Sequence, residues 1–321
     1  MGGARNGKGA AVNRYLITGA TGFVARHLAR RIRAEEPEAA ILGVDKDAAS
    51  RPEIGDFAAL DLLDARAVER TLLEARPTRI VHLASLSSVA GSWEDPAASF
   101  ANNTSIFLNL LEAVRRHGLA CRILSVGSSE EYGAVGADEV PVREERALAP
   151  TSPYAVARVA QEQLSLVYAR SLGLDIVMTR SFNHVGPGQR PVFVLPSIVR
   201  QFAEGRGGPV ELAAGDVSAV RDFTDVRDVA DAYLRLLREG ASGEAYNVCS
   251  GKGVSIAEAI ELVSRIAGRP YVIKVDPARL RPTENPILVG SHEKLSRATG
   301  WSPTIPLERS LADILASMRK D

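Results

Sequence analysis

The sequence of 321 residues lacks three features that mark large classes of protein: it has only two cysteines, no net charge and no long apolar run. Cys121 and Cys249 lie among apolar or small residues, which favours buried thiols in a reducing cytoplasm over a disulfide framework. Basic and acidic residues number 39 each, which gives no support for a nucleic-acid or membrane-surface partner. No apolar stretch approaches membrane-spanning length. Residues 1–13 contain no apolar signal core, and we expect a disordered leader there.

A glycine-rich turn near the start has the sequence Leu16-Ile-Thr-Gly-Ala-Thr-Gly-Phe-Val-Ala25. The apolar run before it predicts a buried strand, and the apolar spacing after it predicts a helix. Gly19 permits a tight turn, Gly22 lets the backbone approach a pyrophosphate, and the small Ala25 lets the helix pack closely on the strand. The free N–H groups that begin a helix bind such an anion. This context favours a dinucleotide site over an ordinary strand-to-helix turn.

The next apolar run, residues 40–44, predicts a second strand that ends at Asp45. A carboxylate at this position accepts hydrogen bonds from the ribose hydroxyls and repels a 2′-phosphate, which favours NAD(H) over NADP(H). The adjacent Lys46 would weaken that preference. The alternative interpretation is that Asp45 only caps the loop.

Strands then alternate with helices along the chain. We expect strands at 57–62, 79–84, 122–126 and 174–179, and helices at 65–75, 97–116 and 154–172. Such alternation predicts a doubly wound, Rossmann-type α/β fold, with a parallel sheet and ligands beyond the carboxyl ends of its strands. We assign residues 14–182 to this domain, with returns around 216–250.

Residues 183–321 predict a smaller, discontinuous α/β lobe that closes over a substrate. Its expected helices are 193–203, 226–238, 254–267 and 306–319, and its expected strands are 210–214 and 246–249. Residues 180–188 and 279–285 are interpreted as polar loops.

Two hydroxyl groups are expected to converge at the carboxyl edge of the sheet. Ser128 follows the strand 122–126, and Tyr154 opens the next long helix. Arg158 is one turn further along the same helix face, where its charge favours the phenolate form of Tyr154 and suits it to acid–base work near neutral pH. The alternative for Tyr154 is an ordinary helix start. Glu131 is interpreted as a solvated surface acid, and Ser129 as a hydrogen-bonding loop residue.

With these motifs the chain resembles the extended short-chain dehydrogenase/reductase family, also called the NAD-dependent epimerase/dehydratase family. The motifs are Thr18-Gly-Ala-Thr-Gly-Phe-Val-Ala25, His82-Leu-Ala84, Asn103-Thr104, Ser128 four residues before Tyr132, and Tyr154. The resemblance implies Ser128 and Tyr154 as the hydroxyl pair on the sugar oxygen, Asn103 as their structural neighbour, and Glu130 at the position of the acid that sugar dehydratases use.

The expected site residues fall into three sets, and none of them implies a metal. The catalytic set is Ser128, Tyr154, Arg158 and Glu130. The cofactor-binding set is Gly19, Thr21, Gly22, Phe23, Val24, Asp45, Asp61, Leu62, Leu83, Ala84, Tyr154 and Arg158. The substrate-binding set is Ser88, Ser128, Ser129, Glu130, Asn183, Arg221, Arg281 and Glu284.

One position departs from the family pattern Tyr-x-x-x-Lys, because this chain has Arg158. The positive charge is kept, but the small ammonium group that bonds the nicotinamide ribose is replaced by a planar guanidinium. A catalytically silenced dinucleotide-binding protein on the same fold is therefore the non-enzyme alternative.

A narrower resemblance, to family members that act on GDP-sugars, is carried by Phe182-Asn-His-Val-Gly-Pro-Gly-Gln189, Val220-Arg-Asp-Phe-Thr-Asp-Val-Arg-Asp228 and Leu280-Arg-Pro-Thr-Glu284. It implies NAD(P)H-dependent reduction of GDP-4-keto-6-deoxy-D-mannose to GDP-D-rhamnose, with Asn183, Arg221 and Arg281 on the diphosphate and Glu284 on the guanosine ribose. GDP-mannose 4,6-dehydratase or another nucleotide-sugar epimerase or dehydratase is the alternative. The helices 97–116 and 154–172 resemble the pair through which the family dimerises, and they imply a homodimer.

Overall fold

The computed structural model describes residues 12–47, 54–205, 207–277 and 285–319. Most of the expected leader lies outside these residues, as do Arg281 and Glu284. Cys121 and Cys249 are both buried free thiols, as the sequence predicted. Within the described part of the chain, no helix is long and apolar enough to cross a membrane.

A parallel sheet of seven strands forms the lower part of the molecule, in the order β10-β6-β5-β4-β1-β2-β3. The strands are β1 Arg14–Thr18, β2 Ala40–Asp45, β3 Asp56–Ala59, β4 Arg79–His82, β5 Arg122–Ser128, β6 Asp175–Ser181 and β10 Ala245–Val248. The chain crosses over between β1 and β4, which is the switch point where such sheets open a ligand crevice at their carboxyl ends. The predicted doubly wound parallel sheet is confirmed.

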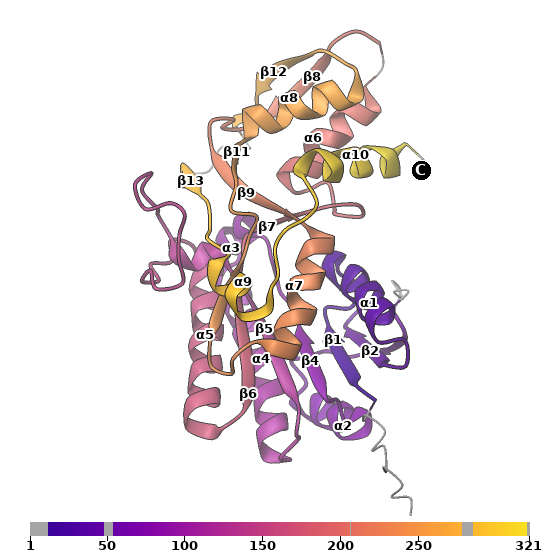
Figure 1. Cartoon of the computed structure of the whole chain (residues 1–321), viewed down its shortest axis with the longest axis vertical. Coiled ribbons are helices and arrows are strands. Elements are labelled where there is room, and N and C mark those ends of the chain that lie inside the picture. Colours follow the sequence, from indigo (N-terminus) through magenta and orange to yellow (C-terminus); the bar gives the residue numbers. More distant parts are fainter. Residues whose placement is uncertain (1–11, 48–53, 206, 278–284, 320–321) are drawn as a thin grey trace, which may run out of the picture.

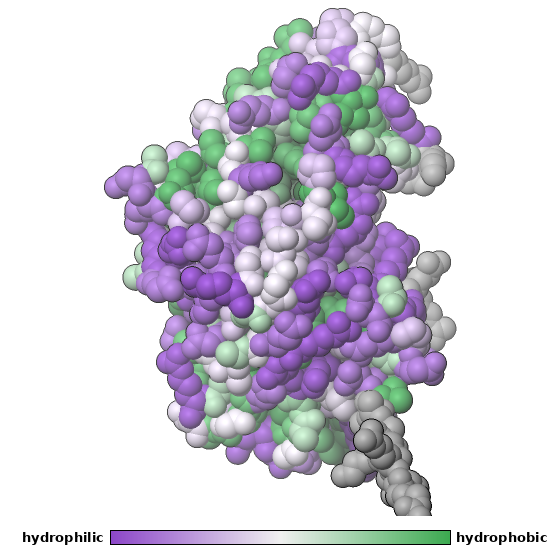
Figure 2. Space-filling model, viewed as in Figure 1, coloured by the Kyte–Doolittle hydropathy of each residue, from purple (hydrophilic) through white to green (hydrophobic). Residues whose placement is uncertain are grey.

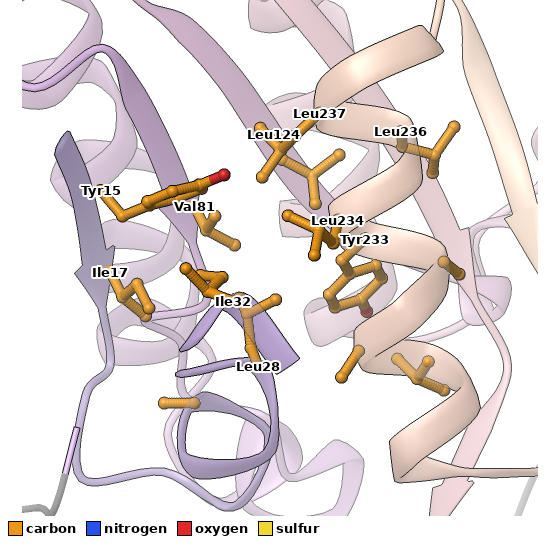
Figure 3. Close-up of a cluster of buried hydrophobic side chains, with 14 of the residues drawn as sticks. Tyr15, Ile17, Leu28, Ile32, Val81, Leu124, Tyr233, Leu234, Leu236 and Leu237 are labelled. Carbon is orange, nitrogen blue, oxygen red and sulfur yellow. The ribbon is translucent and has the colours of Figure 1, made fainter. Parts of the chain in front are cut away.

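Helices cover both faces of this sheet (Figure 1). Those packed on one face are α1 Phe23–Glu35, α7 Val226–Glu239 and α9 Glu293–Thr299, and those on the other are α2 Ala65–Ala75, α4 Pro96–Arg116 and α5 Pro153–Leu172. Successive residues of β1 divide between the two faces, because side chains alternate along a strand. Ile17 packs with Leu28 and Tyr233 on the first face (Figure 3), and Leu16 packs on the second.

The upper lobe in Figure 1 has its own apolar core, which includes Phe202, Leu212, Ile260 and Leu311. Its elements are α6 Val194–Glu204, β8 Val210–Ala214, α8 Ile256–Ala267, β12 Tyr271–Val275 and α10 Leu307–Met318. A four-stranded sheet joins this lobe to the lower domain; its strands are β7 Asn183–Val185, β9 Val220–Asp225, β11 Gly253–Ser255 and β13 Ile287–Leu288. Figure 2 shows hydrophobic residues gathered on the upper lobe, above a mostly hydrophilic surface over α7.

The structure differs from the sequence-based expectation at several places, among them the following. A short helix, α3 Val89–Glu94, precedes α4 and was missed because Asp95-Pro96 ends it after six residues. The expected loop 180–188 contains β7, whose polar residues show no strand-like alternation. Finally, β3 ends at Ala59 instead of residue 62, because the chain turns at Asp61 towards the Asp64 cap of α2.

Candidate active site

The glycine turn between β1 and α1 is shaped for a close anionic ligand. Gly19 has a φ of +68°, and a Cβ atom there would lie 2.8 Å from the Ala84 nitrogen. Gly22 is the N-cap of α1 and provides no side-chain hydrogen bond to the first turn, which also contains no acidic residue. The N–H groups that begin at Phe23 and Val24 are therefore not neutralised by the helix's own cap, which suits a pyrophosphate.

The carboxyl ends of β1 and β4 are joined by Thr18. Its Oγ1 accepts hydrogen bonds from the Leu83 and Ala84 nitrogens, each at 3.1 Å, and lies 3.0 Å from His82 Nδ1. Burial, with a smaller contribution from Arg158, lowers the pKa of His82 to about 3. The imidazole is therefore neutral. Leu83 and Ala84 lie opposite the glycine turn, where the Thr18 hydroxyl holds their backbone in place.

Asp45 lies at the carboxyl end of β2 and contacts the glycine turn directly. Its Oδ2 accepts hydrogen bonds from Thr21 N at 3.1 Å and Thr21 Oγ1 at 2.7 Å. The residue thus caps the turn with one oxygen, and its other oxygen has no bond to a described residue. Asp61 is exposed and accepts a bond from Leu63 N at 2.9 Å, whereas the Leu62 side chain is buried in the core.

The loop after β4 is fixed by α4. Asn103 is buried, and its Oδ1 accepts a bond from Leu86 N at 2.8 Å while its Nδ2 donates to Leu86 O at 3.2 Å. Ser88 then caps α3 by accepting a bond from Gly91 N at 3.0 Å. Asn103 therefore supports the loop that leads to the candidate site.

Ser128 ends β5 and begins a short 3₁₀ helix, η1 Ser129–Tyr132. Its Oγ accepts a bond from Glu130 N at 3.2 Å, and its own N–H donates to Glu131 Oε1 at 2.6 Å. This reciprocal capping box fixes the hydroxyl oxygen, yet leaves its proton able to donate to a ligand. Ser129 is buried and Glu130 is half-buried on the same turn.

Tyr154 is the second residue of α5, which begins at the Ser152 cap. The Arg158 guanidinium carbon lies 5.2 Å from the centre of the Tyr154 ring. Arg158 Nη1 also donates to Val126 O at 3.2 Å and to Gln161 Oε1 at 2.6 Å. Since Val126 precedes Ser128 by two residues on β5, Arg158 joins the segments that carry the two hydroxyl groups.

Two of the four residues expected to bind the GDP part of the substrate, Asn183 and Arg221, lie on β7 and β9. These strands pair in parallel with Asn183 opposite Phe223, and Arg221 occupies the same face as Phe223 because side chains alternate. Asn183 Nδ2 donates to Asp222 O at 3.4 Å, and Arg221 Nη1 donates to Val220 O at 2.9 Å. The other two, Arg281 and Glu284, fall outside the described residues.

The interpretation of Glu131 as a solvated surface acid is wrong. Its side chain is 0% exposed, because η1 turns it inward to accept the Ser128 N–H. Behind it, Arg180 forms a two-pronged ion pair with Glu162, with N–O distances of 2.8 and 2.7 Å. Sequence reasoning missed this cluster. The available signal was a charged Arg180 that directly follows the run Ile176-Val-Met-Thr179 in the buried strand β6.

One arginine faces two carboxyl groups in this cluster, so both carboxyls cannot be ionised at low cost. Burial raises the pKa of Glu131 well above its usual value, and the nearby Glu162 carboxylate raises it further. Glu131 Oε2 is buried without a donor among the described residues. A proton on this oxygen, directed to Glu162, satisfies both carboxyls. The described part of the chain contains no group of three or more His, Cys, Asp or Glu residues that could hold a metal ion.

Comparison with known proteins gives consistent relatives along nearly the whole chain. The sequence model of a family described as GDP-mannose 4,6 dehydratase matches residues 16–314. The GDP-6-deoxy-D-mannose reductase of Pseudomonas aeruginosa is 38% identical over 307 residues, which cover 94% of this chain and 96% of the relative.

Two solved structures share the fold. The structure of RMD from Pseudomonas aeruginosa complexed with NADPH has a TM-score of 0.84 and 36% identity, and covers 96% of this chain and 98% of its own. The UDP-glucose 4-epimerase of Thermus thermophilus in complex with NAD has a TM-score of 0.85 and 33% identity, with 95% and 99% covered.

The raised pKa of Glu131 predicts a pH-dependent stability difference for Glu131→Gln, whose amide imitates the protonated acid. A group whose pKa is raised on folding contributes its full stability below the unfolded value, here 4.5, and loses it as the pH rises towards the folded value. Chemical denaturation should therefore give the natural protein and Glu131→Gln similar stability in acid. The variant should gain up to about 1.4 kcal/mol per pH unit above that value.

The matched control for this prediction is Glu139→Gln. Glu139 is exposed, and its hydrogen bond from Arg146 lowers its pKa, so this variant should show no such gain at rising pH. A constant difference between Glu131→Gln and the natural protein from acid to neutral pH would contradict a protonated Glu131.

Proposed function

The chain belongs to the GDP-mannose 4,6-dehydratase family of extended short-chain dehydrogenases/reductases, and from this premise we propose that it reduces the C4 keto group of GDP-4-keto-6-deoxy-D-mannose to give GDP-D-rhamnose. The relatives are nucleotide-sugar reductases, dehydratases and epimerases, and solved neighbours bind a nicotinamide dinucleotide. The P. aeruginosa relative is named as a GDP-6-deoxy-D-mannose reductase, and its similarity over 94% of this chain supports the same keto sugar as substrate here.

The observation that carries the proposal is the position of Arg158. It packs on the Tyr154 ring and bonds the Val126 carbonyl, which brings the start of α5 against the end of β5 where Ser128 lies. Ser128 keeps a proton to donate, and the Tyr154 hydroxyl has no hydrogen bond to a described residue. Both groups are therefore available to one carbonyl oxygen.

The roles of the residues follow from this arrangement. The nicotinamide dinucleotide, when bound, supplies the hydride that the keto carbon accepts. The glycine turn and the start of α1 fit its pyrophosphate. Ser128 donates a hydrogen bond to the C4 oxygen of the sugar, and Tyr154 donates the proton that converts this oxygen into a hydroxyl group. Arg158 stabilises the phenolate that remains, and Asn183 with Arg221 orients the diphosphate.

GDP-mannose 4,6-dehydration is the second candidate, and Glu130 favours it. This residue is half-buried on η1, next to the Ser128 cap, so a carboxylate is present at the position of the dehydratase acid. A reductase does not need a second acid–base group. If the protein turns over GDP-mannose, Glu130 therefore has a chemical role.

We predict that the purified protein oxidises NADH in the presence of GDP-4-keto-6-deoxy-D-mannose and releases GDP-D-rhamnose. Tyr154→Phe should lower kcat at least about a hundredfold, because it removes only the proton donor, and should leave the dissociation constant for NADH nearly unchanged. Absorbance of NADH measures turnover, and fluorescence titration measures binding.

The control variant is Tyr271→Phe, which changes a tyrosine hydroxyl on the upper lobe that bonds Glu261. It should keep full turnover. Melting-temperature shifts with GDP, UDP and dTDP test the nucleotide separately, since a ligand that binds only the folded state stabilises it. Stabilisation by UDP or dTDP in place of GDP would contradict the proposed substrate, and an inert natural protein would favour the silenced binding protein.

We further propose a preference for NAD(H), because the Asp45 carboxylate lies at the turn and carries a charge that repels a 2′-phosphate. NADH should bind at least about tenfold more tightly than NADPH, which corresponds to about 1.4 kcal/mol. Asp45→Asn keeps an acceptor for Thr21 but removes the charge, and should reduce this ratio. Tighter binding of NADPH by the natural protein would place it with the P. aeruginosa structure that holds NADPH, and would contradict the preference.

A homodimer through α4 and α5 is the proposed assembly. Large apolar side chains are exposed on these two helices at Phe100, Leu108 and Val167. Light scattering after gel filtration should give twice the mass of one chain, and Phe100→Glu with Val167→Glu should give monomers. Val275→Glu changes a valine on β12 that is even more exposed than Val167, and should remain dimeric. A natural protein that elutes as a monomer contradicts the proposal.

A further inference from the structure

The Arg158 guanidinium is a buried cation that no described carboxylate neutralises. The residue is 5% exposed, and its Nε has no hydrogen-bond partner among the described residues. Its contacts are the Tyr154 ring, the Val126 carbonyl and the Gln161 amide oxygen. A long charged side chain without an ion pair tends to extend towards water, so something must hold this one inside.

Gln161 is the side chain that holds the Arg158 guanidinium inside. It is fully buried, and its Oε1 accepts the bond from Arg158 Nη1 at 2.6 Å, the shorter of the two Nη1 bonds. Its Nε2 donates to Ser125 Oγ at 2.9 Å and to Val126 O at 3.1 Å, so each amide hydrogen has an acceptor on β5. The Ser165 hydroxyl lies 3.1 Å from Ser125 Oγ and belongs to the same hydrogen-bond network. The amide therefore has one orientation, with its oxygen towards Arg158.

We propose that Gln161 is a positioning residue that holds the Arg158 cation against Tyr154, and thereby adapts the site to an arginine. Only the measurement of kcat in the experiment below rests on the proposed function. A guanidinium is planar and must be oriented to face the ring, and two acceptors on one Nη atom provide that orientation. A lysine ammonium is a point charge without a plane. A lysine at 158 should therefore depend much less on Gln161.

Other titratable groups do not interfere with this interaction near neutral pH. His82 on β4 and Tyr233 on α7 both lie close enough to sense the Arg158 charge. Burial lowers the pKa of His82 to about 3 and raises the pKa of Tyr233, so both remain neutral. Neither group therefore adds a second charge next to the Arg158 guanidinium near neutral pH.

The experiment is a cycle of four proteins: the natural chain, Gln161→Met, Arg158→Lys and the double variant. Methionine keeps the length of the side chain but offers no amide. Gln161→Met should lower kcat at neutral pH about tenfold in the natural background and less than about twofold in the Arg158→Lys background. The KM for the sugar nucleotide should not change. An equal loss in both backgrounds means that Gln161 has only a structural role, and overturns the proposal.

A second readout needs neither substrate nor cofactor. Ultraviolet difference absorbance follows phenolate formation with pH, and the Tyr154 contribution is the part that disappears in a matched Tyr154→Phe protein. Gln161→Met should move this transition upward by about one pH unit, which corresponds to a tenfold loss of phenolate. This measurement stands even if the protein does not turn over GDP-sugars, so failure of the proposed function and failure of the proposal are separable. An unmoved transition overturns the proposal.

Two further variants provide a control and a substitute for Gln161→Met. Gln201→Met removes a glutamine that also bridges a helix to a strand, between α6 and Ala213, and should keep turnover and the phenolate transition. If Gln161→Met does not fold, Ser125→Ala removes one acceptor of the Gln161 amide and leaves a smaller defect. Its transition should move in the same direction, and no movement overturns the proposal.

Discussion

A buried positive charge beside a phenol is the constraint on which the proposed site depends. The Arg158 guanidinium carbon lies 5.2 Å from the centre of the Tyr154 ring, so its electrostatic field acts on the phenol. That field is strong only if the charge is not cancelled by a neighbouring carboxylate. Arg158 meets this condition, because its described partners are a carbonyl, an amide and an aromatic ring, all of them neutral. The cost of burying the cation is thereby tied to the acid–base role of Tyr154.

A second buried arginine shows the opposite arrangement. Arg180 on β6 bonds both oxygens of Glu162 and also contacts Tyr132, with the protonated Glu131 beside the pair. Its charge is therefore neutralised and serves packing around η1, from which Ser128 projects. Glu162 follows Gln161 directly on α5, so one turn of this helix provides a neutral partner to Arg158 and an ionised partner to Arg180. The two arginines differ in function because their neighbours differ in charge.

Much of the fold and part of the site could be predicted from sequence because they depend on local patterns. The run into Gly19 and the apolar spacing after Phe23 fix a strand, a turn and a helix, and the structure confirms them. Glu131 could not be predicted, since the pattern of neighbouring serines and acids does not tell which acid η1 turns inward. In the sequence, Gln161 is an ordinary polar residue of a long helix. Its role appears only when α5 packs on β5 and Ser125 comes within reach.

Glu130 and Glu131 show how two adjacent acids acquire separate chemistry. The 3₁₀ turn directs Glu131 into a buried cluster, where burial raises its pKa and its Oε1 accepts the Ser128 N–H. Glu130 stays half-buried, and its backbone N–H donates to Ser128 Oγ. A carboxyl that holds its proton and is committed to the backbone cannot serve as a catalytic base. Glu130 is then the carboxyl of η1 that remains available for acid–base chemistry in the proposed site. The choice between simple carbonyl reduction and dehydration thus depends on whether the sugar brings its C5 and C6 within reach of that carboxylate.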